Sequence, residues 1–421
     1  MTLGWPINII KAGKYLFSLE ERLVLLIAQW VVTDCKGPEI EKILSQALLN
    51  WDHFNLLLAQ HELSSFAYAC LKNYSALLPV PEIDLLRKNH YFILARLADL
   101  EKEFLMLADI FQGQKVDLLP LKGAAFLIDQ IYGDKFGLRP MVDMDILVKK
   151  ENLFQAEKLI VALGYRKQLC GFKEDYWRRK SYHIIFTKEK NGKICFHLEM
   201  HWLLDYPRKR LLLPLLWDRI RKLQVGDKQI ALLSVEDTLF CLALHLRRFG
   251  NVLSLKSACD FACLLTKYKD LDWDYILQEA NQGEMRTSLY FRLIQASVFF
   301  DIQVPNLILN NLSPAIYKQR VIKNFIANDT FLDLDKMAKS LFLKNHFVVY
   351  DNFWEPADMI INMPVEQFAK FYRLAPYSPG TYFLYCLRFL YFPLHLLMQI
   401  LKVIERKIVA RLALSIESKA I

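Results

Sequence analysis

The sequence predicts an α+β fold in which a small mixed β-sheet is flanked by N- and C-terminal helical regions. Three observations predict it: residues 18–112 show helical periodicity, short strands alternate with helices between residues 113 and 233, and helical periodicity returns from residue 234. A chain of 421 residues is long enough to build such regions with proper cores. We therefore expect four segments: an N-terminal helical region (1–112), an α/β core (113–233), a C-terminal helical region (234–340) and an apolar, basic helical tail (341–421).

The N-terminal region is expected to be helical because its apolar residues recur at spacings of three and four. Residues 23–27 and 56–58 lie in amphipathic windows, and residues 85–111 repeat the spacing among arginine, lysine and glutamate. Pro79 and Pro81 interrupt the pattern, since proline lacks a backbone N–H and breaks a helix interior. We therefore expect a break in the helical region at this proline pair.

The core alternates between the period of a strand and the period of a helix. Its expected elements follow in chain order: a strand at 116–119, a helix at 123–132, a strand at 141–148, a helix at 152–163, and strands at 165–169, 182–187 and 193–202. Gly164 is expected to end the second helix. Asn191 and Gly192, between the last two strands, are typical of a tight hairpin turn, which requires positive φ at both residues.

The C-terminal region opens with a helix-start signal. Ser234 is a suitable N-cap, and Glu236 and Asp237 place negative charge in the first turn, where the helix dipole favours it. Helical patterns continue to about residue 340, with interruptions near Pro305 and Pro314.

Composition limits the classes of protein and partner. The chain is 54% hydrophobic with a mean hydropathy of +0.15, which argues against disorder and favours contact with an apolar surface. Its net charge of +9 suits anionic partners such as nucleotides, lipid headgroups or nucleic acid, without choosing among them. Eight cysteines without a C-x-x-C pair fit a reducing compartment, and residues 1–17 lack the features of a signal peptide. We expect a cytoplasmic protein, with a peripheral location at the inner face of the membrane as the alternative.

Residues 382–416 are expected to form an apolar, basic helix. The first twenty of these residues carry only Arg388 and His395 as ionisable groups, and several basic residues follow. The apolar stretch has the length of a membrane span, but Arg388 and Pro393 within it disfavour spanning. A helix that packs on the protein, or one that makes peripheral contact with a membrane surface, fits better.

Asp143 and Asp145 are the most informative pair of residues in the chain. They form a D-x-D motif inside the apolar run 141–148, which is expected to be a strand. Because alternate residues of a strand point to the same face, the two carboxylates lie side by side. Two adjacent carboxylates repel each other unless a cation lies between them, and Mg²⁺ is the usual cation with a preference for oxygen ligands. The motif is therefore a candidate metal site for phosphoryl or nucleotidyl chemistry.

Two neighbouring features could bind the phosphates of a nucleotide. Lys122 and Gly123 follow the strand at 116–119 and open a helix; the glycine allows a close backbone approach to a phosphate, and the lysine adds a mobile positive charge. Arg139, just ahead of the D-x-D strand, could pair with its acids or hold a triphosphate. The alternatives are a plain strand-to-helix turn and a surface salt bridge.

A third acid is expected from the strand at 193–202. His197, Glu199 and His201 share one face of that strand, so Glu199 could complete a metal cage in which two Mg²⁺ ions activate a hydroxyl and neutralise a triphosphate. A zinc site is disfavoured, because the strand rise separates the two histidines by about 13 Å. We expect one histidine to contact the substrate or support a ligand, and the other to be structural.

These residues resemble the bacterial nucleotidyltransferase family related to the polymerase β superfamily. The resemblance is carried by Lys122-Gly123, Arg139, Asp143-Met144-Asp145, the Gly164 turn and Glu199-Met200-His201-Trp202. Further residues look like family features: Trp51, His61, His245, Lys256, Asp260, Asp272 and Trp273. The resemblance covers roughly residues 20 to 310.

The resemblance implies a small nucleotidyltransferase core set between helical regions. Asp143 and Asp145 would be the metal-binding pair and Glu199 the third carboxylate, with Glu174 and Asp175 as alternatives for the third acid. The implied reaction transfers a nucleoside monophosphate from an NTP to a hydroxyl of a small molecule or a protein, with Mg²⁺ as the cofactor. Positioning and charge neutralisation would supply most of the rate enhancement.

The phosphate-binding end of the site departs from the wider superfamily. The usual Gly-Ser opening of the nucleotide-binding helix is absent, and Lys122 and Gly123 stand in its place. Lys122, Gly123, Arg139 and His201 are therefore the expected nucleotide contacts. A general base could be His201 or one of the three acids.

Two other functions remain as alternatives. A catalytically degenerate relative would use the fold as a nucleotide-binding or interaction platform, with its apolar tail on a membrane or a partner. A nucleic-acid enzyme is the weaker alternative, because the basic clusters at 178–180 and 208–210 are short and typical of solvated turns. Nucleic acid is therefore not expected as a partner.

Overall fold

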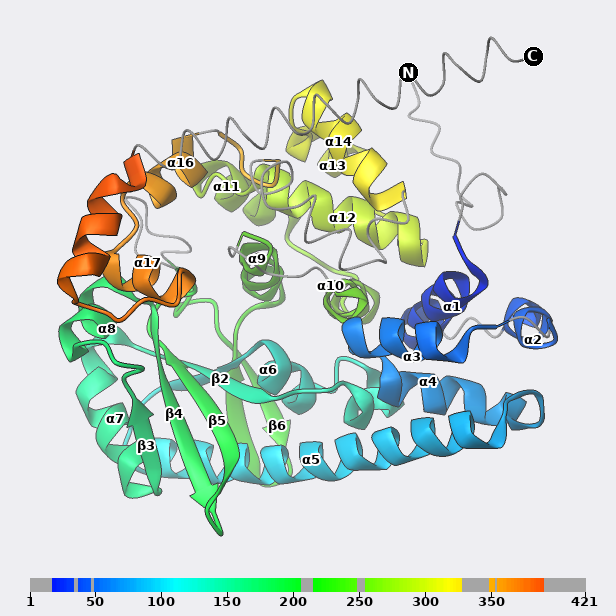
Figure 1. Ribbon diagram of the computed structural model, residues 1–421, viewed down its shortest axis with the longest axis horizontal. Helices are drawn as coiled ribbons and strands as arrows, with labels where there is room; N and C mark the ends of the chain where they lie inside the picture. The colour runs from blue at the N-terminus through cyan, green and yellow to red at the C-terminus, as the bar shows by residue number, and fades with distance from the viewer. Residues whose placement is uncertain are drawn as a thin grey trace. The chain divides into compact units, whose positions relative to one another are not determined.

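The expected core forms a five-stranded mixed sheet with the strand order β1-β2-β5-β4-β3, which confirms the α+β fold class (Figure 1). β2 and β5 pair in parallel, and every other neighbouring pair in this sheet is antiparallel. The strands are β1 (Leu118–Leu121), β2 (Asp143–Val148), β3 (Tyr165–Gln168), β4 (His183–Lys190) and β5 (Lys193–His201).

The computed structural model describes most of the chain. The described residues are 17–33, 37–46, 49–205, 215–247, 254–327, 348–352 and 354–389. They fall into two compact units. The first comprises the described residues of Met1–Leu169 and Trp177–Asn352, and the second those of Cys170–Tyr176 and Phe353–Ile421.

The β4–β5 hairpin turns at the predicted Asn191 and Gly192, whose φ angles are 54° and 72°. A β-bulge at Lys188 and Glu189 then shifts the pairing of the two strands by one residue. Beyond the bulge, Ile184 and Phe186 lie on the same buried face as Leu198 and Met200, opposite the polar face of β5. The bulge therefore keeps the apolar faces of both strands on one side of the sheet.

β1 lies at the edge of the sheet and leads directly into the helix α6 (Lys122–Ile128). Pro120 is tolerated in β1 because an edge strand leaves some backbone groups unpaired. The helix α6 is shorter than the predicted 123–132, since Gln130 adopts a positive φ of 47° soon after its end. The predicted helix at 152–163 is α7 (Leu153–Ala162), preceded by the 3₁₀ turn η3 (Lys150–Asn152).

Two elements of the region were not predicted. The hairpin of β6 (Arg221–Val225) and β7 (Lys228–Leu232) forms a separate two-stranded sheet, and α8 (Glu174–Lys180) is a short helix. The hairpin strands are rich in lysine, arginine and glutamine, which masks their alternation. The seven residues of α8 are too few to show a helical period.

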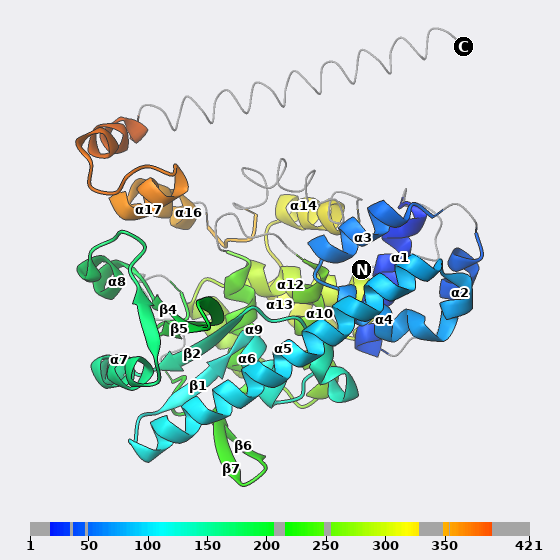
Figure 2. The same cartoon turned by 60° about the horizontal axis from the view of Figure 1, so that its bottom comes forward.

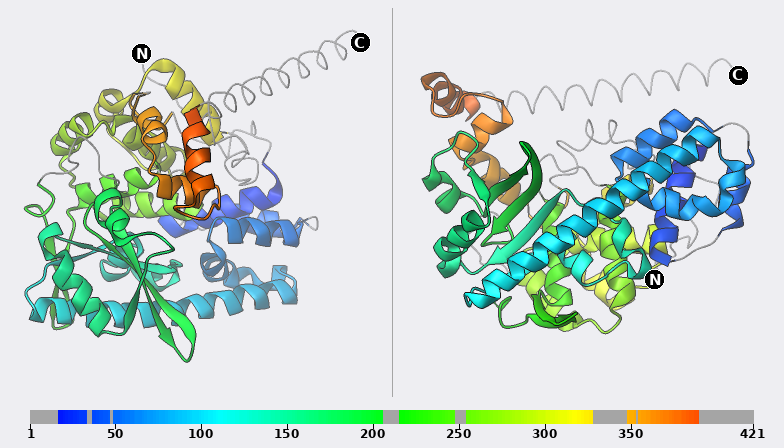
Figure 3. Two further views of the ribbon diagram at one scale, coloured as in Figure 1. Left: turned by 60° about the vertical axis from the view of Figure 1, so that its left-hand side comes forward. Right: turned by 90° about the horizontal axis from the view of Figure 1, so that it is seen from below.

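The N-terminal region is helical, as predicted, and ends in a long helix that reaches the sheet. Its elements are α1 (Leu19–Thr33), α2 (Pro38–Leu44), α3 (Trp51–Gln60), α4 (Ser64–Leu71), η1 (Lys72–Leu77) and α5 (Val80–Gly113). Pro79 is the N-cap of α5, and Pro81 lies in its first turn, so the predicted break is confirmed. Figures 2 and 3 show α5 extending from the N-terminal helices along the sheet, where Glu103 accepts hydrogen bonds from Tyr165 of β3 and Lys188 of β4.

The C-terminal helical region packs against the N-terminal one. Its elements are α9 (Val235–His245), α10 (Leu255–Lys267), α11 (Trp273–Gln282), α12 (Arg286–Phe300), α13 (Asn306–Leu312) and α14 (Ile316–Ala327). Ser234 accepts a hydrogen bond from the backbone N–H of Asp237, as expected of an N-cap. α1 packs on α10 and α12, and the side-chain amide of Gln29 donates to the Phe299 carbonyl (2.8 Å). Two segments distant in sequence thus share one core beside the sheet.

The second unit includes α16 (Trp354–Ile361), α17 (Val365–Phe371) and a helical stretch at 379–389. The Tyr385 hydroxyl donates to the Met363 carbonyl (2.7 Å), which joins this stretch to the loop before α17. Within the described residues, no helix combines the length and apolar character needed to cross a membrane. Of the tail expected at 382–416, residues 390–416 lie outside the described residues.

Candidate functional site

The parallel pairing of β2 and β5 brings the two acidic motifs together. The register places Asp145 opposite Glu199 and Asp143 opposite His197. In a sheet, directly paired residues project to the same face, so the carboxylates of Asp145 and Glu199 are neighbours. Asp145 is buried, with 4% of its surface exposed, whereas Asp143 and Glu199 are half-buried.

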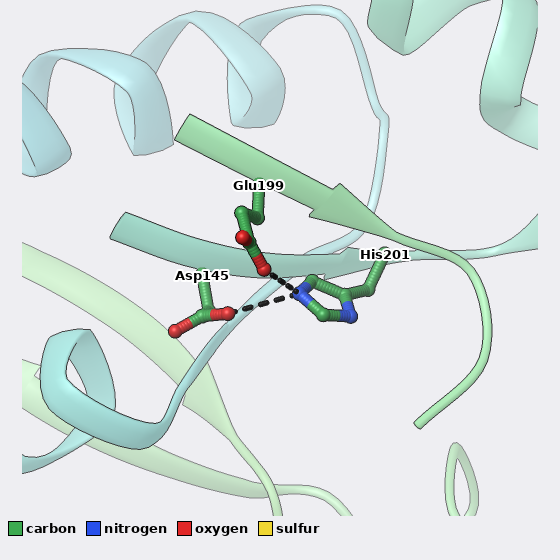
Figure 4. A group of neighbouring side chains, drawn as sticks. All are labelled: Asp145, Glu199 and His201. Atoms are coloured by element: carbon green, nitrogen blue, oxygen red, sulfur yellow. Dashed lines mark hydrogen bonds and ion pairs between the residues drawn. The ribbon is translucent and has the colours of Figure 1, made fainter. Parts of the chain in front are cut away.

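Asp145, Glu199 and His201 form a cluster of three potential metal ligands. One ligand atom from each lies within 4.8 Å of the others, and Figure 4 shows the three side chains converging from β2 and β5. His201 Nε2 lies 2.9 Å from Asp145 Oδ1 and 3.3 Å from Glu199 Oε2. The structure therefore brings a histidine, as well as the predicted third acid, to the D-x-D motif.

The His201 ring is held in place by its neighbours. It is fully buried and lies against the rings of Tyr182 and His183, with centroid distances of 5.6 and 5.1 Å. His201 Nδ1 is buried and has no hydrogen-bond partner among the described residues, so all polar contacts of the ring are made through Nε2. Packing thus aims Nε2 at the carboxylates.

Lys122 approaches the cluster from the turn between β1 and α6. Its ammonium nitrogen lies 2.6 Å from Asp145 Oδ1. The preceding residue, Leu121, pairs with Asp145 across β1 and β2, which places the turn beside the acid. Lys122 has a φ of 47°, a left-handed conformation that is strained for a residue with a side chain and often marks a functional site.

Gly123 has a packing role in the structure. A Cβ at this position would lie 2.6 Å from Arg139 Nη1 and 2.6 Å from Met141 Sδ. Glycine is therefore required if Arg139 and Met141 are to pack against the start of α6. Gly123 lies next to Lys122 at the start of α6, and its predicted contact with a nucleotide stays a prediction.

Arg139 pairs with Asp260 of α10, not with the acids of the D-x-D motif. Arg139 Nε and Nη2 donate to Asp260 Oδ1 and Oδ2 at 2.6 and 2.7 Å, a bidentate geometry. The Tyr132 hydroxyl donates to the same carboxylate at 2.5 Å. The pair is buried, which corrects the alternative of a surface salt bridge, and it connects the loop before β2 to the C-terminal helices.

The surroundings of the site lower the pKa of two of its acids and raise the pKa of the third. Burial would raise the pKa of Asp145, but the Lys122 ammonium and the contact with His201 outweigh it and hold that pKa well below its usual range. Burial and the hydrogen bond from His201 also oppose each other at Glu199, whose pKa is lowered. Burial, aided by the charges of Asp145 and Glu199, raises the pKa of Asp143. Asp143 is therefore the acid that holds a proton most readily.

The contacts that several residues make near the site were not predicted from the sequence. His183 pairs with His201 across β4 and β5, and its Nε2 lies 4.0 Å from Glu199 Oε2. Asp260 and Lys256 were noted only as family features, and the structure places Lys256 Nζ 3.5 Å from the Pro140 carbonyl. The sequence signal for His183 was its place on a strand facing β5. The pairing of Arg139 with Asp260 could not be predicted from the sequence around either residue, because 121 residues separate them.

The geometry agrees with a comparison against protein families. The model of a family described as uncharacterised nucleotidyltransferases matches residues 48–301, which is more than half of the chain and includes all of the site residues above. No curated protein and no solved structure matches the chain.

Proposed function

Because the chain belongs to the family of uncharacterised nucleotidyltransferases, we propose that it transfers a nucleoside monophosphate from an NTP to a hydroxyl of a small molecule or a protein. The observation that carries this proposal is the convergence of Asp145 on β2 with Glu199 and His201 on β5. The reaction would release pyrophosphate. Its cofactor would be Mg²⁺, with two ions held by the three carboxylates of the site.

The donor groups fit a divalent metal. Asp143, Asp145 and Glu199 supply carboxylate oxygens, the ligands that Mg²⁺ prefers. Asp143 and Asp145 would hold one ion, and Asp145 and Glu199 the other. Bound metal would polarise the phosphate and favour loss of the acceptor proton.

The chain's own groups would bind the nucleotide and take up the proton. Lys122 can exchange its contact with Asp145 for a phosphate oxygen, because its side chain is long and flexible. Gly123 allows Arg139 to lie beside this turn, and Arg139 Nη1 faces Gly123 while its other nitrogens are held by Asp260. The proton of the acceptor hydroxyl would pass to His201 or to one of the three acids of the site.

A non-catalytic nucleotide-binding or interaction platform is the second candidate. One observation favours it: Lys122 and His201 already compensate the charge of Asp145. A site stabilised in this way does not depend on a metal to tolerate its buried acid. The two candidates differ in whether bound NTP is converted.

The test is calorimetric titration of the full chain with each of the four NTPs in the presence of Mg²⁺, followed by a pyrophosphate-release assay. We expect NTP binding that requires Mg²⁺ and that Asp145→Asn abolishes. Asp99→Asn, at an exposed position on α5, is the matched control and should bind as the unaltered protein does. Binding that survives Asp145→Asn would refute the assignment, and binding without pyrophosphate release for any acceptor would favour the platform.

We also propose a cytoplasmic location with peripheral contact at the inner face of the membrane through residues 382–416. Of these, the structure describes 382–389, where Phe383, Leu384 and Phe389 are exposed. Such side chains suit an interfacial position beside basic residues. Co-sedimentation of the full chain with anionic phospholipid vesicles should be reduced by Phe383→Glu; equal sedimentation of both proteins would contradict this contact.

A further inference from the structure

An imidazole nitrogen lies among the carboxylates that the proposed function assigns to the metal. His201 Nε2 is 2.9 Å from Asp145 Oδ1 and 3.3 Å from Glu199 Oε2. An ion about 2.1 Å from two ligands at right angles separates those ligands by about 3 Å. Nε2 is therefore spaced from each oxygen like a neighbour in a coordination sphere, and the ligand atoms of all three residues lie within 4.8 Å of one another.

Without a metal, these contacts form a hydrogen-bond network in which two carboxylates share His201 Nε2. Nε2 can carry only one proton, but both carboxylates face it. Asp145 Oδ1 also accepts from Lys122 at 2.6 Å. A cation at this point would interact favourably with both carboxylates and with the nitrogen lone pair at once.

The ring of His201 cannot easily turn away from the acids. It is fully buried, and it packs against Tyr182 and His183. By contrast, His197 lies four residues earlier on the same face of β5, is half-buried and pairs with Asp143 in the strand register. Only His201 is part of the ligand cluster found among the described residues. The two histidines of one strand thus provide a ligand candidate and a matched control.

We infer that Asp145, Glu199 and His201 form a mixed oxygen–nitrogen site that binds Mn²⁺ in preference to Mg²⁺. Mg²⁺ prefers oxygen ligands alone and retains its waters, whereas imidazole is a ligand for transition metals and carboxylates suit Mn²⁺. The position between Asp143 and Asp145 has oxygen ligands only and remains a Mg²⁺ site. This inference rests on the proposed function for the presence of a metal, and it replaces Mg²⁺ by Mn²⁺ at one of the two metal positions.

The inference is tested on the full chain, without an affinity tag, by electron paramagnetic resonance of Mn²⁺ during titration and during competition with Mg²⁺. We expect Mn²⁺ to bind at least tenfold more tightly than Mg²⁺. His201→Asn should remove most of this preference, and His197→Asn should leave it intact. An unchanged preference in His201→Asn would overturn the inference.

A second measurement does not depend on the folding of a variant. Electron spin-echo spectroscopy of Mn²⁺ bound to the unaltered protein should detect coupling to an imidazole ¹⁴N nucleus, and its absence would overturn the inference. The two proposals can fail separately. Imidazole-coordinated Mn²⁺ without NTP binding would leave the inference standing and refute the enzyme. Nucleotidyl transfer without nitrogen coupling would support the enzyme and overturn the inference.

Discussion

The ammonium group of Lys122 lies 2.6 Å from the carboxylate of Asp145, and Lys122 reaches this position from a left-handed backbone conformation. The contact is largely buried, with 15% and 5% of the two side chains exposed. It places a cation of the protein itself at the acid expected to hold the metal. Lys122 and a divalent ion therefore compete for Asp145, and a nucleotide phosphate would draw Lys122 away.

Removing the charge of Lys122 should separate metal binding from nucleotide binding. In Lys122→Met we expect the affinity for Mn²⁺ without nucleotide to rise severalfold, because the competing ammonium is gone. NTP affinity should fall about tenfold, since a phosphate contact is lost. Titration of both ligands checks this, with Lys122→Arg as the charge-retaining control. Equal metal affinity in Lys122→Met and Lys122→Arg would show that there is no competition.

Breaking the pair of Arg139 and Asp260 should destabilise the first unit strongly. We expect Asp260→Asn to cost about 3–5 kcal/mol of unfolding free energy, because it leaves the buried guanidinium without its counter-charge. Urea denaturation followed by circular dichroism measures the change. The exposed pair of Asp84 and Arg87 provides the control: Asp84→Asn should cost less than about 1 kcal/mol. Similar costs at both sites would contradict a structural role for Arg139.

A methyl group at position 123 should be poorly tolerated. Gly123→Ala would push against Arg139 and Met141, and we expect a loss of about 1–3 kcal/mol. Gly113 is the matched control, because a Cβ there would meet nothing within 4 Å and the residue lies at the end of α5. Gly113→Ala should be neutral or slightly stabilising in the same denaturation experiment. If Gly123→Ala proves equally harmless, the close packing at the start of α6 is not needed.

Asp143→Asn should stabilise the metal-free protein while it abolishes metal-dependent activity. Burial and the charges of Asp145 and Glu199 raise the pKa of Asp143, so its ionised form disfavours the folded state. The folded protein then holds more protons than the unfolded one between the ordinary pKa of 3.8 and the raised pKa, and its stability falls as the pH rises through this window.

The melting temperature in the presence of EDTA, measured across this pH range, tests the role of Asp143. The advantage of Asp143→Asn over the unaltered protein should be absent at the acidic end and complete above the raised pKa. Addition of Mg²⁺ should stabilise only the unaltered protein. A constant difference at every pH would mean that the titration of Asp143 does not contribute.

Local sequence patterns determined the order of the elements and the position of the acid pair. The alternation around Asp143 and Asp145 has the period of a strand, and the turn at Asn191 and Gly192 lies where predicted. Ser234 is the N-cap of α9, as its sequence context predicts. These features depend on backbone preferences within a few residues, which a single sequence displays. The expected fold class followed from them and is confirmed by the sheet and its flanking helices.

Tertiary structure decided which side chains share the site. The turn alone would pair His183 with Met200, but the bulge at Lys188 and Glu189 shifts the register and pairs His183 with His201. Arg139 finds Asp260 at a separation of 121 residues. Such partnerships depend on how distant segments pack and on one-residue shifts in register. A local pattern does not specify these, because its period is the same whichever partner the segment meets.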